Sequence, residues 1–112
     1  MSQARTGWTF LTNHARALLQ ISQDTEVRLR DVAEVCGLTE RSARAIVADL
    51  ETAGYLTHSR RGRRNHYQLV GRTQFRHPAE AHQEISGLLG LFARSRAAGG
   101  PDLSGPSAGE PR

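Results

Sequence analysis

Apolar residues near the start of the chain recur at the spacing of an amphipathic helix. Between residues 12 and 23 they are Ala15, Leu18, Leu19 and Ile21. Thr12 or Asn13 can cap this helix, because a short polar side chain accepts a hydrogen bond from a free N–H group of the first turn. The sequence therefore predicts a first helix over residues 12–23. Trp8, just before it, is expected to anchor packing with its large ring.

The next apolar positions predict a short strand and a second helix. Residues 27–30 alternate Val, Arg, Leu, Arg, which is typical of a strand with one buried face. A second helix is expected over residues 31–36, with the acidic Asp31 favourably placed in its first turn. Gly37 then interrupts the pattern, at a position where a tight turn requires a positive φ.

A third helix is indicated after this turn. Thr39 can cap it, and the acidic Glu40 lies in its first turn. The helix is expected to run to about Ala53, because Gly54 suits the left-handed conformation that commonly follows a helix. Its buried stripe has helical spacing and consists of Ala43, Ile46, Val47 and Leu50.

The pattern changes to alternation beyond the third helix. Residues 55–58 and 66–70 are strand candidates. The polar loop 59–65, SRRGRRN, joins them and has Gly62 at its centre. The sequence therefore predicts an antiparallel hairpin with an arginine-rich loop.

One more helix is predicted at residues 79–93, after Pro78. Its apolar stripe consists of Ala81, Ile85, Leu88, Leu89 and Phe92. Residues 97–112 are a Gly, Pro and Ser mixture that we expect to be disordered. The predicted organisation is a single domain over residues 1–96, with its core in 9–72 and its C-terminal helix at 79–93, and then the tail.

Composition narrows the class of protein. The 112 residues carry a formal net charge of +4, and all 15 of the Lys and Arg residues are arginine. The single cysteine, Cys36, cannot form an internal disulfide, and no apolar run approaches the roughly 20 residues that span a bilayer. No signal region follows the N-terminus, so we expect a soluble cytoplasmic protein with no membrane association.

Catalytic and metal chemistry are not expected. The five histidines show no i, i+4 ligand pair, and no phosphate-binding glycine loop or nucleophile elbow is present. We therefore predict no enzyme activity, no metal and no cofactor. One further hypothesis is that His58 and His66 are neighbours across the hairpin, so that the wing gains positive charge below about pH 6.5. Another is that Cys36 is a redox sensor. Ordinary surface histidines and an inert thiol are the simpler interpretations.

The segment LRDVAEVCGLTERSARAIVADL, residues 29–50, is the most specific motif. Two helices that cross steeply over a short turn need a small residue at Ala33 and a glycine at Gly37. The apolar positions that hold them together are Val32, Cys36, Leu38, Ala43 and Ile46. With the hairpin, this order resembles the winged helix-turn-helix domain of bacterial transcription regulators, particularly the MarR-like group. The resemblance covers roughly residues 12–70 and implies a mainly α fold with a small antiparallel β wing (α+β).

The resemblance implies sequence-specific binding to double-stranded DNA. The third helix, residues 39–53, would lie in the major groove as the recognition helix and present Thr39, Glu40, Arg41, Ser42, Arg44 and Ala45. Arg41 and Arg44 share one face, and either could bind a guanine edge through two hydrogen bonds. The alternative is that both are solvated surface arginines. Glu40 either accepts from a cytosine amino group or only favours the helix N-terminus.

The loop looks like the wing of this family, which lies on the phosphate backbone or in the minor groove. Residues 59–77 hold six arginines and no acidic residue. Guanidinium groups crowded on a short loop repel one another unless an anion is bound. The wing residues expected at DNA are Arg60, Arg61, Arg63, Arg64 and Asn65.

The remaining expectations concern assembly and mode of action. MarR-like regulators dimerise through terminal helices, so the C-terminal helix is expected to form a homodimer interface with Ile85, Leu88, Leu89 and Phe92. Covering the domain's own core is the alternative role of this stripe. Repression is the commonest mode for such proteins, and a small-molecule effector is left open. The competing functions are a winged-helix protein-interaction module and a non-specific nucleic-acid or RNA binder.

Overall fold

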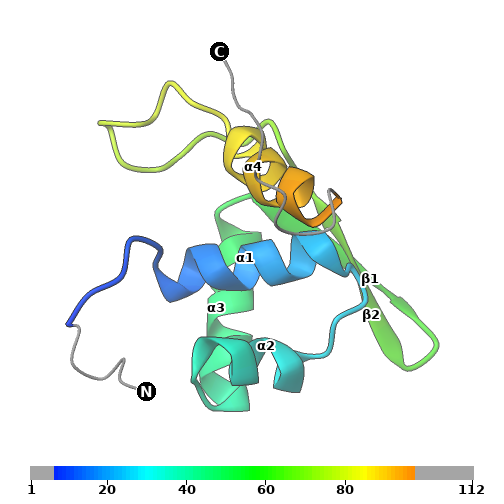
Figure 1. Ribbon diagram of the computed structural model, residues 1–112. Coiled ribbons are helices and arrows are strands. Elements are labelled where there is room, and N and C mark those ends of the chain that lie inside the picture. The colour runs from blue at the N-terminus through cyan, green and yellow to red at the C-terminus, as the bar shows by residue number, and fades with distance from the viewer. Residues whose placement is uncertain (1–6, 98–112) are drawn as a thin grey trace. The chain divides into compact units, whose positions relative to one another are not determined.

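The computed structural model describes residues 7–97 (Figure 1). The elements in this range are α1 (Asn13–Gln23), α2 (Leu29–Cys36), α3 (Glu40–Thr52), β1 (Leu56–Arg61), β2 (Arg64–Leu69) and α4 (Ser86–Ala97). They fall into two compact units that divide after Leu69, and each unit is described by itself. The tail predicted from residue 97 lies outside the described residues, apart from Ala97 at the end of α4.

The first helix forms as predicted. Thr12 is its N-cap, and the Thr12 side chain accepts a hydrogen bond from the backbone N–H of Ala15 at 3.1 Å. Its buried residues are Ala17, Leu18, Leu19 and Ile21. Ala17 thus takes the core position expected for Ala15, which is only half-buried.

The strand predicted at residues 27–30 does not form, because Leu29 already begins α2. Leu29 fits an alternating pattern and a helical one equally well, and in the structure it lies one helical turn before the buried Val32 and Ala33. One backbone hydrogen bond still joins this connection to the hairpin. The backbone N–H of Tyr67 in β2 donates to the carbonyl of Thr25 at 2.9 Å.

The turn between α2 and α3 has the geometry that the motif predicts. Gly37 has a φ of 70°, and no atom outside its neighbours lies within 4 Å of a Cβ built on it. Backbone conformation, not space, therefore requires glycine here. Thr39 caps α3 by accepting from the N–H of Ser42 at 3.0 Å. The predicted stripe is confirmed, since the buried residues are Ala43, Ile46, Val47 and Leu50.

The hairpin is longer than predicted. Arg61 pairs with Arg64, so the loop shrinks from residues 59–65 to Gly62 and Arg63. Gly62 has a φ of 64°, and no non-glycine residue in the described range has a positive φ, which matches a two-residue type II′ turn. The prediction failed because both faces of this ribbon are solvated near its tip. A strand that is exposed on both faces does not need alternating apolar residues, so the sequence pattern gives no sign of it.

The second unit corrects the predicted C-terminal helix. α4 begins at Ser86, not after Pro78. Residues 73–75 instead pair with residues 83–85 through backbone bonds from Phe75 to Gln83 (3.0 Å) and from Ile85 to Thr73 (2.8 Å). The proline lies in the loop that this pairing closes. Ala81 and Ile85 of the predicted stripe therefore precede the helix.

The expected packing role of Trp8 is wrong. Its side chain is 68% exposed, and its ring meets that of Phe10, which is 90% exposed, edge to face at 5.1 Å. Arg16 secures the backbone that follows. Its guanidinium donates to the carbonyl of Leu11 at 3.0 Å and to the side chain of Asn13 at 2.8 Å.

The first unit has the predicted fold class. Three helices form one core, α2 and α3 are joined by a tight turn, and an antiparallel hairpin follows α3 and extends away from the helices (Figure 1). This is a winged helix-turn-helix arrangement, with β1 and β2 as the wing.

Candidate nucleic-acid interface

The N-terminal half of α3 presents an exposed polar face opposite its buried stripe. Arg41, Arg44 and Ala45 are all exposed on it. Arg44 lies 3.9 Å from Glu40 in an i, i+4 pair whose side chains are 67% and 56% exposed. Such a pair is weak, and it can be exchanged for another partner. The side chain of Arg41 makes no hydrogen bond or ion pair with any described residue, so its guanidinium is free to bind a ligand.

Thr39 and Ser42 are engaged in the helix cap. The hydroxyl of Thr39 accepts a hydrogen bond from the backbone N–H of Ser42. The same hydroxyl donates to the side-chain hydroxyl of Ser42 at 3.1 Å. Both residues are exposed. The cap therefore fixes the first turn of α3 and leaves its outer surface open. Glu40 lies in this first turn, where its negative charge interacts favourably with the positive end of the helix dipole.

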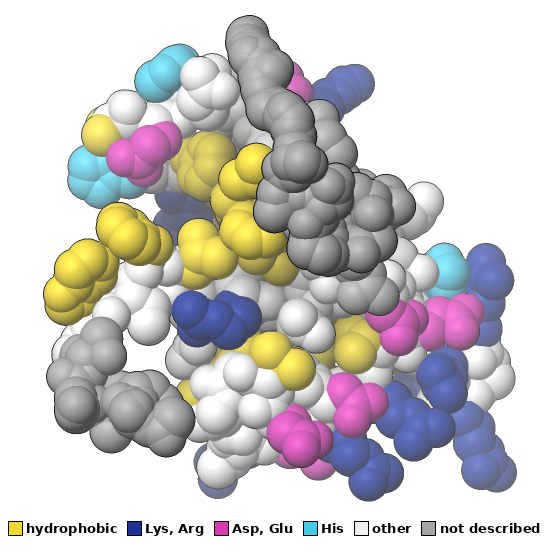
Figure 2. Space-filling model, in the orientation of Figure 1, with side chains coloured by type: hydrophobic (Ala, Val, Ile, Leu, Met, Phe, Trp, Pro, Cys, Tyr) yellow, Lys and Arg dark blue, Asp and Glu magenta, His cyan; other side chains and the backbone are white. Residues whose placement is uncertain are grey.

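The arginines of the wing are largely unpaired. Arg60, Arg61 and Arg63 are exposed, and their side chains make no hydrogen bond or ion pair within the described residues. Arg64 donates from Nη1 to the carbonyl of Glu26 at 3.2 Å, which leaves its charge uncompensated. Like charges directly opposite each other, as in the Arg61 and Arg64 pair, destabilise a ladder. Figure 2 shows arginine side chains gathered over the outer part of the hairpin.

The base of the wing is held on both of its faces. His66 lies on one face, with its Nδ1 3.3 Å from the carboxylate of Glu26 in the connection between α1 and α2. His58 contacts Glu51 of α3 through its Nδ1, and its ring lies 6.0 Å from that of Tyr67. His58 pairs with Tyr67 in the ladder and His66 with Ser59. The two histidines therefore point to opposite faces and are not the neighbours that the charge-gain hypothesis required.

A cleft of about 370 Å³ joins the predicted site residues of α3 and the wing. Its lining comes from the start of α2, the start of α3 and the wing, and consists of Val27, Arg28, Leu29, Glu40, Arg63, Arg64, Asn65 and Tyr67. Asn65 is half-buried, and its Oδ1 is buried without a hydrogen-bond partner. Four predicted residues from two separate elements therefore share one hollow surface.

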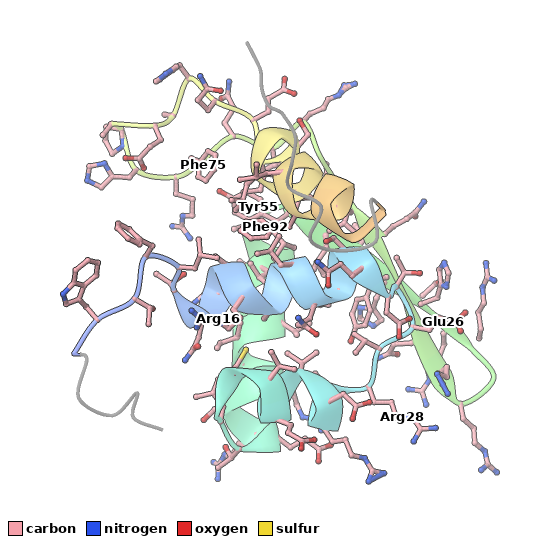
Figure 3. All side chains as sticks on the ribbon, in the orientation of Figure 1. Arg16, Glu26, Arg28, Tyr55, Phe75 and Phe92 are labelled. Atoms are coloured by element: carbon pink, nitrogen blue, oxygen red, sulfur yellow. The ribbon has the colours of Figure 1, made fainter. Side chains whose placement is uncertain are left out.

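Sequence reasoning missed Arg28 in this cleft. Figure 3 shows Arg28 and Glu26 on the connection between α1 and α2, beside the hairpin. Arg28 is the N-cap residue of α2, and its side chain makes no capping bond. Had the helix been predicted to start at Leu29, Arg28 would have been recognised as its N-cap residue. Its proximity to Arg63 depends on tertiary packing and has no local signal.

Cys36 has the environment of an unreactive thiol. Burial raises the pKa of the Cys36 thiol, and the nearby Arg16 guanidinium lowers it by a smaller amount. Its Sγ lies 4.0 Å from the carbonyl of Asn13. A raised pKa reduces the thiolate fraction at neutral pH, which disfavours the redox-sensor hypothesis.

The residues predicted for the dimer interface belong to the second unit. Ile85 is 5% exposed, whereas Leu88, Leu89 and Phe92 are half-buried and the unpredicted Leu91 is 57% exposed. Within residues 7–97, no three His, Cys, Asp or Glu side chains gather as a metal site would require. In the same range, every helix is too short or too polar to cross a membrane.

Two solved structures are similar to the chain. One is MepR, a transcription regulator of the Staphylococcus aureus multidrug efflux pump MepA, with 10% identity over 91% of this chain and 74% of that one, and a TM-score of 0.48. The other is RV1404 from Mycobacterium tuberculosis, with 19% identity over 89% and 81% of the two chains and a TM-score of 0.49. No protein-family model and no curated protein sequence matches the chain.

Proposed function

We propose that this chain is a transcription regulator that binds double-stranded DNA in a sequence-specific manner. The observation that carries the proposal is the shared surface of α3 and the wing. One cleft is lined by Glu40 of α3 and by Arg63, Arg64 and Asn65 of the wing. A single duplex lying on this surface would meet both elements, one in a groove and the other along a backbone.

The first turns of α3 suit the major groove. A major groove about 12 Å wide admits an α-helix, and an arginine can bind O6 and N7 of guanine together. Arg41 is free of partners, and Arg44 gives up only an exposed ion pair. The small, exposed Ala45 lets the helix approach the base edges closely and offers a methyl group to thymine. These three side chains would carry base preference.

The wing suits the phosphate backbone. Its arginines repel one another in the free protein, and a row of phosphates removes that repulsion. Contacts to phosphates give affinity and register without sequence information. Three wing arginines have no partner among the described residues. They are therefore ready to exchange solvent and counterions for phosphate oxygens.

Selection of genomic fragments with the purified protein tests the proposal. The best fragment is then titrated against scrambled duplex at several salt concentrations. We expect the selected site to bind about a thousandfold more tightly or better, with a salt dependence that reports several phosphate contacts. Weak, salt-sensitive binding that is equal for every duplex would point to non-specific binding. A lack of any duplex binding would point to a protein partner.

A paired variant separates base reading from charge. Arg41→Ala should reduce the preference for the selected site by about 5- to 150-fold, because a bidentate guanine contact contributes roughly 1 to 3 kcal/mol of discrimination. Arg72→Ala removes the same charge from an exposed position outside α3 and the wing and should leave the preference unchanged. Equal loss in both variants would show that α3 does not read bases.

Assembly and mode of regulation belong to the same proposal. A homodimer through α4 would place two recognition helices on half-sites about one helical turn apart, and the selected sequence would then be nearly palindromic. Binding within a promoter would repress transcription by excluding polymerase from that promoter. A selected site without symmetry would indicate a monomer.

A further inference from the structure

We propose that the cleft between the start of α2 and the wing is a binding site for one phosphodiester group of the DNA backbone, with Arg28 and Arg63 on its two sides. This inference rests on the proposed function and adds a residue outside the predicted interface. It divides the interface into three parts, which are α3 at the bases, the wing along the backbone and the cleft at a single phosphate.

The charges of the cleft favour an anion. Arg28, Arg63 and Arg64 line it, against the single carboxylate of Glu40. That carboxylate lies 3.9 Å from the Arg44 guanidinium, so part of its charge is compensated from outside the cleft. Arg64 donates to a neutral carbonyl and keeps its positive charge. An excess of guanidinium groups in one hollow is stabilised by an anion of matching size.

The donor geometry favours phosphate over a simple point charge. A guanidinium offers a planar fork of N–H groups that matches two phosphate oxygens, and such charge-assisted bonds are among the stronger ones. Arg28 approaches from the helical core, and Arg63 from the tip of the hairpin. Two forks that reach the same cleft from different elements can bind different oxygens of the same phosphate. This arrangement would fix the wing relative to the duplex.

Two features of the cleft agree with a bound anion. No side chain makes a capping hydrogen bond at the start of α2, so Asp31 is the only acidic residue of its first turn that offsets the helix dipole beside Arg28. Asn65 lines the same cleft, and its Oδ1 is buried without a partner. An amide oxygen only accepts hydrogen bonds, so it is the NH₂ group, presented by a rotation of the amide by about 180°, that would donate to a phosphate oxygen. The arginines carry the inference, and these features strengthen it.

The cleft is held open by contacts that do not use Arg28 or Arg63. Thr25 and Glu26 accept from Tyr67 and Arg64, and Glu26 also meets His66. Arg28 is exposed and makes no capping bond, so its removal should not disturb the fold. The variants below therefore test binding, not folding.

The experiment measures binding of full-length variants to the selected duplex and to copies with one neutral methylphosphonate at each backbone position in turn. Arg28→Ala should weaken binding about tenfold on selected and scrambled duplexes alike, which is the size expected for one charge-assisted contact. It should also reduce the salt slope by about 1. One methylphosphonate position that weakens the wild type should no longer weaken this variant.

Arg30→Ala is the matched control. Arg30 is exposed and lies two residues further along α2, but it does not line the cleft. Its loss should leave the sensitivity to that methylphosphonate intact. Arg28→Lys keeps the charge and should preserve the salt slope with a smaller loss of affinity. If Arg30→Ala erases the same methylphosphonate position, general electrostatics acts there and the site is not in the cleft.

The outcomes separate this inference from the proposed function. A wild-type protein that binds no duplex overturns the function. Duplex binding that Arg28→Ala leaves unchanged in affinity, salt slope and methylphosphonate pattern overturns the phosphate site alone. If inorganic phosphate raises the melting temperature only when Arg28 is present, while the methylphosphonate pattern is unchanged, the cleft binds a free anion and not the DNA backbone.

Discussion

Replacing Gly37 with alanine should destabilise the protein through backbone conformation alone. Gly37 ends α2 with a φ of 70°, and a Cβ built there meets no atom within 4 Å. Steric collision with other residues therefore contributes nothing. What remains is the cost of holding an L-residue in the left-handed region, roughly 1 to 2 kcal/mol. That cost acts on the turn that orients α2 against α3.

The matched control is Gly90→Ala. Gly90 lies in the interior of α4, has no positive φ and likewise has open space around its Cβ position. Alanine there should stabilise by about 0.5 to 1 kcal/mol, because glycine loses more freedom in a helix. The same chemical change is thus predicted to have opposite signs at two open positions.

Denaturant unfolding followed by circular dichroism measures both changes. Gly37→Ala should lower the midpoint at an unchanged slope, and in thermal unfolding a loss of 1 kcal/mol lowers the melting temperature by about 4 to 8 °C for a domain of this size. A Gly37→Ala variant as stable as the wild type would refute the reasoning. So would equal losses at Gly37 and Gly90, because the φ angle would then not decide the effect.

Three more predictions follow from single residues. The rate of Cys36 alkylation should increase with pH, and this increase should occur at higher pH in the folded protein than in the urea-unfolded chain. The reason is that the raised pKa of the thiol lowers the fraction of thiolate at a given pH. Coincident pH profiles of the folded and unfolded chains would contradict this. Thr39→Ala should cost about 1 kcal/mol in denaturant unfolding by removing the cap of α3, and Thr39→Ser should restore it. Trp8 is the only tryptophan, and acrylamide should quench its fluorescence almost as in the unfolded chain, since its side chain is 68% exposed; strong protection would mean that another surface covers it.

The helix-turn-helix could be predicted because its determinants are local. The Thr39 cap, the Gly37 turn and the buried stripe of α3 all lie within one short segment, and each supports the same boundaries. Elsewhere the deciding interactions are remote in sequence. α4 starts late because residues 73–75 pair with residues 83–85, and no local feature near Pro78 reports that pairing.

The sequence supplied candidate residues for the site but not its geometry. Charge and position indicated Arg41 and Arg63 as candidates, since exposed arginines on a helix start and a hairpin tip have a sequence signature. The cleft has none, because it forms where the chain brings Arg28 back beside the wing. Arg28 was also missed because residues 27–30 fit the pattern of a strand as well as that of a helix, and a strand was predicted there.

Because residues 27–30 form no strand, the sheet of the wing has only the two strands β1 and β2 within the described residues. A two-stranded ribbon is only marginally stable alone, so its direction depends on contacts at its base. The Thr25 carbonyl and Glu26 hold β2, and Glu51 of α3 holds β1 through His58. Because one of these contacts comes from α3, the wing and α3 are linked directly. A duplex that aligns α3 in its groove would therefore also set where the arginine tip meets the backbone.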